Sequence, residues 1–140
     1  MQGFLERREG IRPVQVRTKL ANLMWDKVGI FRTGKELQEA VSEIERMQRE
    51  EIPRLYATGQ GTRYNHEWIK AFEVENMVLT AKMIAKAALM REETRGAHYR
   101  KDFPKADNKN WFVNIVIKQE NGKMTFKKVP VVVTLLKPEA

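Results

Sequence analysis

The stretch from Met77 to Met90 constrains the fold of this 140-residue chain most, because apolar residues lie around most of its helical circumference. Its only polar residues are Thr80, Lys82 and Lys86. The stretch is shorter than the roughly 20 residues of a membrane span and carries two lysines, so we expect a buried helix. Such a helix must be covered on several sides, which predicts a bundle and further contact with another domain.

Two shorter helices are predicted before this central one. The first should begin at Pro13, a residue favoured at the opening helical position, and stop at Gly29. The second should begin at Thr33, which forms with Glu36 the Ser/Thr-x-x-Glu pattern of a capping box. Pro53 cannot donate a backbone hydrogen bond, so the second helix should kink or end there.

The central helix is expected from about Glu67 to about Arg91, with Asn65 as its N-cap. Short connections between three amphipathic or apolar helices favour antiparallel neighbours. The sequence therefore predicts a mainly α fold, a three-helix up-down-up bundle.

The last third of the chain changes to the two-residue period of β-strands. Two β-rich runs, 111–117 and 123–129, flank an Asn-Gly dipeptide at 121–122. Asn-Gly is the strongest short-range signal for a β-hairpin with a type I′ turn, and the register pairs Ile117 with Phe126. A lone hairpin is marginal in water, so we expect it to dock on the bundle or on a partner.

The composition is that of one ordinary globular domain, with 42% hydrophobic and 31% charged residues. We expect the bundle and its C-terminal loop at residues 12–104, and the hairpin and tail at 105–140. The chain has no cysteine, which excludes a disulfide framework and a thiolate metal site. No apolar signal-peptide core is present at the N-terminus, so a reducing, intracellular compartment is predicted.

The formal net charge of +8 suits a nucleic acid, an anionic membrane surface or an acidic partner protein. The basic residues are interleaved with glutamates, as in residues 43–51, which is typical of solvated helix faces. No recognisable nucleic-acid-binding fold accompanies the charge. A basic helical nucleic-acid-binding module therefore stays a minor alternative.

A search for catalytic, cofactor-binding and metal-binding residues identifies none. Residues 29–36 nearly match a phosphate-binding loop, but Glu36 replaces the hydroxyl residue and would repel phosphates. Ser42 has no basic residue arranged to activate it. His66 and His98 lack partners at metal-ligand spacing. We therefore expect that the chain is not an enzyme on its own.

The densest cluster of polar residues lies at 91–104, where the central helix should end. Gly96 can adopt the left-handed conformation that caps a helix, and Pro104 forbids its continuation.

Two interpretations of this cluster stay open on the residues alone. The structural one is that arginines satisfy the last helical carbonyls and pair with Glu93 and Asp102. The functional one is that Arg95, His98 and Arg100 grip a carboxylate or a phosphate. Ion-pair networks at helix ends are common, which favours the first.

The run from Arg91 to Pro104, with Arg-Gly-Ala-His at 95–98, strongly resembles the C-terminal signature of succinate dehydrogenase and fumarate reductase flavoprotein subunits. Asp107, Asn110-Trp111, the upstream run Val28–Arg32 and Glu73-x-x-Asn76 extend the match, which covers about residues 12 to 117.

This resemblance implies a spectrin-like bundle that follows an FAD-binding domain and a mobile capping domain in a longer subunit. FAD and the catalytic residues would belong to those domains, which this chain lacks. The implied parent enzyme is an oxidoreductase of the tricarboxylic acid cycle or of electron transport, which interconverts succinate and fumarate. L-aspartate oxidase and adenylylsulfate reductase share this domain, so the parent reaction stays open between them.

The resemblance also implies partners and a location. The segment 91–104 would pack the end of the bundle against the FAD-binding domain of the same subunit. Electrons would pass to an iron–sulfur subunit, which would hold the protein in the cytoplasm at the inner membrane face without direct insertion. The surplus apolar surface predicts self-association of the isolated domain. The implied domain-interface residues are Arg91, Glu93, Arg95, Gly96, His98, Arg100 and Asp102.

Overall fold

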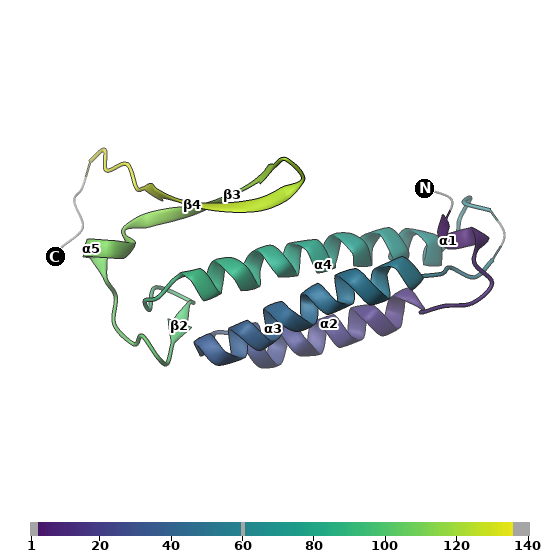
Figure 1. Cartoon of the computed structure of the whole chain (residues 1–140), viewed down its shortest axis with the longest axis horizontal. Helices are drawn as coiled ribbons and strands as arrows, with labels where there is room; N and C mark the ends of the chain where they lie inside the picture. Colours follow the sequence, from purple (N-terminus) through teal and green to yellow (C-terminus); the bar gives the residue numbers. More distant parts are fainter. Residues whose placement is uncertain (1–2, 60, 136–140) are drawn as a thin grey trace.

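Three long helices lie side by side and form most of the molecule in the computed structural model, which describes residues 3–59 and 61–135 (Figure 1). They are α2 (Pro13–Val28), α3 (Gly34–Arg46) and α4 (His66–Met90), and they run up, down and up. The short helix α1 (Gly3–Glu6) lies at one end of the bundle. The predicted mainly α bundle is confirmed.

The predicted starts of the first two helices are confirmed by their capping contacts. Helix α2 begins at Pro13, as expected for a residue that has no N–H to satisfy. At the start of α3, the Thr33 hydroxyl accepts a hydrogen bond of 3.2 Å from the Glu36 N–H. The same hydroxyl donates to the Glu36 carboxylate at 2.8 Å. Together they fix where the chain turns into α3.

Helix α3 ends in a wide turn followed by a tight one. A π-helical turn, η1 (Met47–Glu51), continues it, and a 3-10 turn, η2 (Ile52–Arg54), follows. Pro53 lies inside η2 and cannot donate a hydrogen bond, so the regular ladder cannot continue past it. The sequence allowed helix α3 either to kink at Pro53 or to end before it, and the structure shows that it ends before it.

Helix α4 is the longest element, with 25 residues. The Asn65 side chain accepts from the Trp68 N–H at 3.0 Å, which confirms the predicted N-cap. The prediction that Gly96 caps this helix is wrong, because α4 ends at Met90. Gly96 instead has a φ of +56° in the tight turn that joins Arg95 to His98.

The core between the three helices is apolar, and the helices contribute side chains of different size to it. Leucine, isoleucine and valine side chains come mainly from α2 and α3, and α4 adds small residues that let the helices approach closely. The buried residues of the three helices are Pro13, Val16, Leu20 and Val28, Leu37, Ala40, Val41 and Ile44, and Ala71, Val74, Val78, Ala81, Ala85 and Ala88.

The C-terminal hairpin has the predicted register. Strands β3 (Val113–Glu120) and β4 (Lys123–Pro130) are antiparallel, and Ile117 pairs with Phe126. Asn121 and Gly122 have φ values of 52° and 75°, as a type I′ turn requires.

The first strand begins two residues later than the sequence predicted. Trp111 belongs to the short helix α5 (Asn108–Trp111), because the Asp107 side chain caps that helix by accepting from the Asn110 N–H at 3.0 Å. Two cations contact the buried indole ring: Arg91 Cζ lies 5.4 Å and Lys128 Nζ lies 3.3 Å from the ring centroid. The tryptophan thus joins the hairpin to the end of the bundle.

The hairpin extends back over α4 (Figure 1). A cavity of about 470 Å³ lies between them, lined by Leu79 and Met83 of α4 and by Ile117 and Met124 of the hairpin. The hairpin therefore covers a second side of α4 loosely. No helix of residues 3–59 and 61–135 has the length and apolar character to cross a membrane.

Candidate functional site

The loop end of the bundle brings together two segments that lie far apart in the sequence. Strand β1 (Phe31–Arg32) pairs in parallel with strand β2 (Tyr99–Arg100), through N–H···O bonds of 3.1 and 2.9 Å at its two ends. The polar side chains around this pair form the arginine cluster, defined as Arg32, Arg91, Glu93, Arg95, His98, Arg100 and Asp102.

Arg100 closes the C-terminal end of α4. Its side chain is almost fully buried, with 2% of the residue exposed. Nη1 donates to the carbonyl oxygens of Ala88, Leu89 and Arg91 at 3.2, 3.2 and 2.9 Å. The last carbonyls of a helix have no intrahelical partners, so this guanidinium replaces a glycine cap. The structural interpretation of the cluster is confirmed here.

Asp102 links Arg100 to the start of α3. Its two carboxylate oxygens accept from Nε and Nη2 of Arg100 at 2.8 Å each, and Oδ2 also accepts from the Gly34 N–H at 2.8 Å. The Arg100 hydrogen bonds hold the pKa of Asp102 well below its usual range. A Cβ at Gly34 would lie 3.0 Å from Oδ2, so a larger residue there would crowd the ion pair of Asp102 and Arg100.

Glu93 is the buried centre of the cluster, with 0% exposed. It pairs with Arg91, and Arg95 donates to both of its oxygens at 2.9 Å. The Asp107 N–H donates a further bond of 2.9 Å. Burial alone would raise the pKa of Glu93, but the hydrogen bonds from Arg95, Asp107 and Arg91 lower it overall. Glu93 therefore stays ionised.

His98 lies between two arginine-bearing segments. Arg32 Nη1 is 2.6 Å from His98 Nδ1, and His98 Nε2 is 3.1 Å from the Arg91 carbonyl oxygen. Because arginine can only donate, Nδ1 must accept and the ring proton must be on Nε2. Burial, with the charges of Arg32, Arg100 and Arg91, lowers the pKa of His98. The imidazole is therefore neutral at neutral pH.

Arg32 belongs to this site, although sequence reasoning did not single it out. Its Nε donates to the Gly29 carbonyl oxygen at 2.5 Å, and its Nη1 donates to His98. Burial and the charge of Arg100 lower the pKa of Arg32. The signal was available, because Arg32 ends the run from Val28 that shares the family resemblance.

The other predicted site residues are placed in the same loop. Gly96 lies at the turn that joins Arg95 to His98, with open space where a Cβ would stand. Arg95 also donates to Asn108 at 2.7 Å, which ties the turn to α5. In residues 3–59 and 61–135, no group of histidine and carboxylate side chains could hold a metal. Through hydrogen bonds and ion pairs, the cluster holds the loop after α4 to β1, to the start of α3 and to α5.

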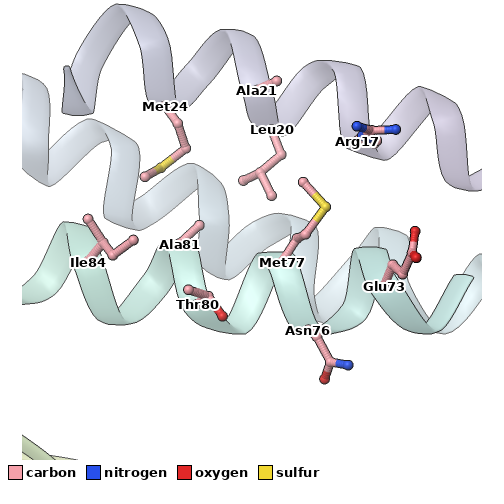
Figure 2. A pocket seen from close by; sticks show the side chains of 10 residues that line it. All are labelled: Arg17, Leu20, Ala21, Met24, Glu73, Asn76, Met77, Thr80, Ala81 and Ile84. Atoms are coloured by element: carbon pink, nitrogen blue, oxygen red, sulfur yellow. The ribbon is translucent and has the colours of Figure 1, made fainter. Parts of the chain in front are cut away.

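An open groove of about 590 Å³ lies between α2 and α4 (Figure 2). Leu20 of α2 points towards Met77 of α4 across it, Met24 points towards Ala81 and Ile84, and Arg17 and Glu73 lie at one end. Asn76 is exposed and points away from α2 in Figure 2.

These features define a helical packing domain, a bundle with one cross-linked end and one open apolar groove. The family model described as fumarate reductase flavoprotein C-term matches residues 17–140. The chain belongs to this family of flavoprotein C-terminal domains.

Two curated relatives and one solved structure illustrate the match. The fumarate reductase flavoprotein subunit of Helicobacter pylori strain J99 is 35% identical over 109 residues, which cover 77% of this chain and 15% of the relative. L-aspartate oxidase of Acinetobacter baylyi is 40% identical over 89 residues, 64% of this chain and 15% of the relative. The apo Sdh1 complex of Mycobacterium smegmatis superposes with a TM-score of 0.85 at 30% identity, covering 96% of this chain and 23% of that one. The chain thus spans less than a quarter of these proteins.

Proposed function

We propose that this chain is the C-terminal structural and assembly domain of a flavoprotein subunit of an FAD-dependent succinate dehydrogenase or fumarate reductase, here called the parent subunit. The family match over residues 17–140 carries this proposal. A relative named as a fumarate reductase flavoprotein subunit supports the reaction. The parent subunit would bind FAD in its own flavin-binding domain, interconvert succinate and fumarate, and pass electrons to an iron–sulfur subunit. Partner subunits would hold the parent subunit at the cytoplasmic face of the membrane.

The role of the domain within the parent subunit would be to present a fixed loop to the FAD-binding domain. Glu93 and Arg100 are buried by contacts inside the chain, so they would act by holding the shape of this loop. Arg91 and Asp102 would assist them through their ion pairs. The turn with Arg95, Gly96 and His98 would make the contact.

The test compares the full-length parent subunit with a version that lacks this domain. We expect the deletion to remove fumarate reduction by the complex and to abolish co-purification with the iron–sulfur subunit. The 140-residue chain alone should show no flavin absorbance and no activity. A truncated subunit that assembles and turns over normally, or an isolated chain that reduces fumarate, would contradict the proposal.

L-aspartate oxidase is a second candidate for the parent enzyme, because one relative with that name is 40% identical. The two candidates differ in substrate, so assays of the full-length parent subunit with succinate and with L-aspartate distinguish them. Oxidation of L-aspartate without succinate oxidation would assign the domain to the second class.

A further inference from the structure

Arg32 is a cation that the described part of the chain does not neutralise. Its two contacts are to the Gly29 carbonyl oxygen and to the imidazole of His98. Within residues 3–59 and 61–135 it forms no ion pair, whereas Arg91, Arg95 and Arg100 each pair with a carboxylate. A partly buried charge without a counter-ion is destabilising, so it needs a reason to be kept.

The two carboxylates of the arginine cluster are already occupied. Glu93 pairs with both Arg91 and Arg95, and Asp102 holds Arg100 through both of its oxygens. The charge of Arg100 also acts on the Arg32 guanidinium. The cluster therefore has more positive than negative charge where β1 meets β2.

The guanidinium of Arg32 has free donors that suit a carboxylate. Of its five N–H groups, Nε and one on Nη1 are used. Both N–H groups of Nη2 have no acceptor among residues 3–59 and 61–135, and the side chain is only half-buried. A donor on a charged guanidinium forms a strong, charge-assisted hydrogen bond with a carboxylate oxygen.

The two residues that precede Arg32 in the chain carry large, exposed apolar side chains. Ile30 and Phe31 precede Arg32 and are 58% and 63% exposed. The Phe31 ring packs edge-on against Tyr99, with 5.3 Å between centroids. Exposed aliphatic and aromatic groups around an arginine are the composition of the centre of a protein–protein interface. A partner that covered them would also exclude water from the ion pair.

We propose that Ile30, Phe31, Arg32 and Tyr99 form a docking surface for another part of the parent subunit, and that Arg32 receives an aspartate or glutamate carboxylate from it. This inference rests on the proposed function. It extends the interface beyond residues 91–104 to residues 30–32 and states the chemistry of the partner, a carboxylate surrounded by apolar side chains.

The test measures backbone hydrogen exchange of residues 30–34 in the 140-residue chain and in the FAD-loaded parent subunit. We expect exchange to be roughly tenfold slower in the parent subunit. Arg32→Gln should remove most of the protection that the parent subunit adds, beyond any change that it causes in the 140-residue chain. Arg54→Gln is the matched control, because Arg54 is exposed in η2, which follows the end of α3 that is far from Arg32, and it should change neither.

Two results would overturn the docking surface. Equal exchange of residues 30–34 in both proteins would show that nothing covers β1. Slower exchange of the 140-residue chain in inorganic phosphate, with no further slowing in the parent subunit, would assign Arg32 to a free anion. The proposed function would survive either result if deletion of the domain still abolished assembly with the iron–sulfur subunit.

Discussion

Glu93 holds the arginine cluster together, since three segments of the loop donate hydrogen bonds to one buried carboxylate. Glu93→Gln would leave Arg91 and Arg95 without their counter-ion. Breaking a buried ion pair from one side costs about 3–5 kcal/mol, so we expect a loss of that order in the free energy of unfolding, measured by urea denaturation. Glu50→Gln, at an exposed surface pair, should have little effect. Equal stability of the two variants would contradict the central role of Glu93.

His98 should make the stability of the loop depend on pH. Its pKa is lowered in the folded chain, so the unfolded chain binds a proton at higher pH than the folded chain does. The contribution of His98 is therefore complete above the unfolded pKa of about 6.5 and is lost as the pH falls through the folded value.

The measurement is thermal unfolding of the wild-type chain and of His98→Gln between pH 7.5 and 5. We expect the wild-type chain to lose stability more steeply on acidification, because protonation of Nδ1 would direct an N–H at the Arg32 guanidinium. Parallel pH profiles for the two chains would show that His98 does not titrate against Arg32.

The turn of the hairpin is the element most sensitive to one backbone conformation. Gly122 has a φ of +75°, which an L side chain rarely adopts. Gly122→Ala should destabilise the hairpin by about 1 kcal/mol and weaken NMR contacts between Ile117 and Phe126, while the bundle unfolds as before. Asn121→Gly is the control, since glycine accepts the φ of 52° at that position. A hairpin unchanged by Gly122→Ala would contradict this account of the turn.

Local signals determined which elements could be predicted. Pro13, the Thr33 cap and the Asn-Gly dipeptide at 121–122 act within a few residues of themselves, so the sequence shows them directly. The end of α4 was expected at about Arg91 and lies at Met90, but the group that caps it was predicted wrongly. Arg100 caps it, reaching the Ala88 carbonyl oxygen from twelve residues further along the chain.

At the site, contacts within one segment could be predicted, whereas contacts between distant segments could not. The pairing of arginines with Glu93 and Asp102 was predictable because all of them lie in one short run. Only the family resemblance of the run from Val28 pointed to Arg32, because its place in the site depends on a β-pairing between residues 31–32 and 99–100 that no local pattern encodes. Contacts between distant loops are a property of the folded chain.

Across the whole molecule, α4 has three differently covered sides. Its alanine and valine side faces the core, and the side with Leu79 and Met83 lies beneath the hairpin. The third side, with Met77 and Ile84, opens into the groove shared with α2 (Figure 2). The sequence predicted that two helices could not cover this helix, and the groove is the remaining apolar surface.

This uncovered side should make the isolated 140-residue chain self-associate, because burying exposed apolar area is favourable in water. We expect sedimentation velocity to show a species heavier than the monomer as the concentration rises. Ile84→Lys should restore the monomer, since it places a charge in the groove at a side chain that is already 46% exposed. Val132→Lys, a change at an 84% exposed side chain beyond the hairpin, should leave association intact. A wild-type chain that stays monomeric at every concentration would show that the groove is too small or too polar at its edges to bind a second copy.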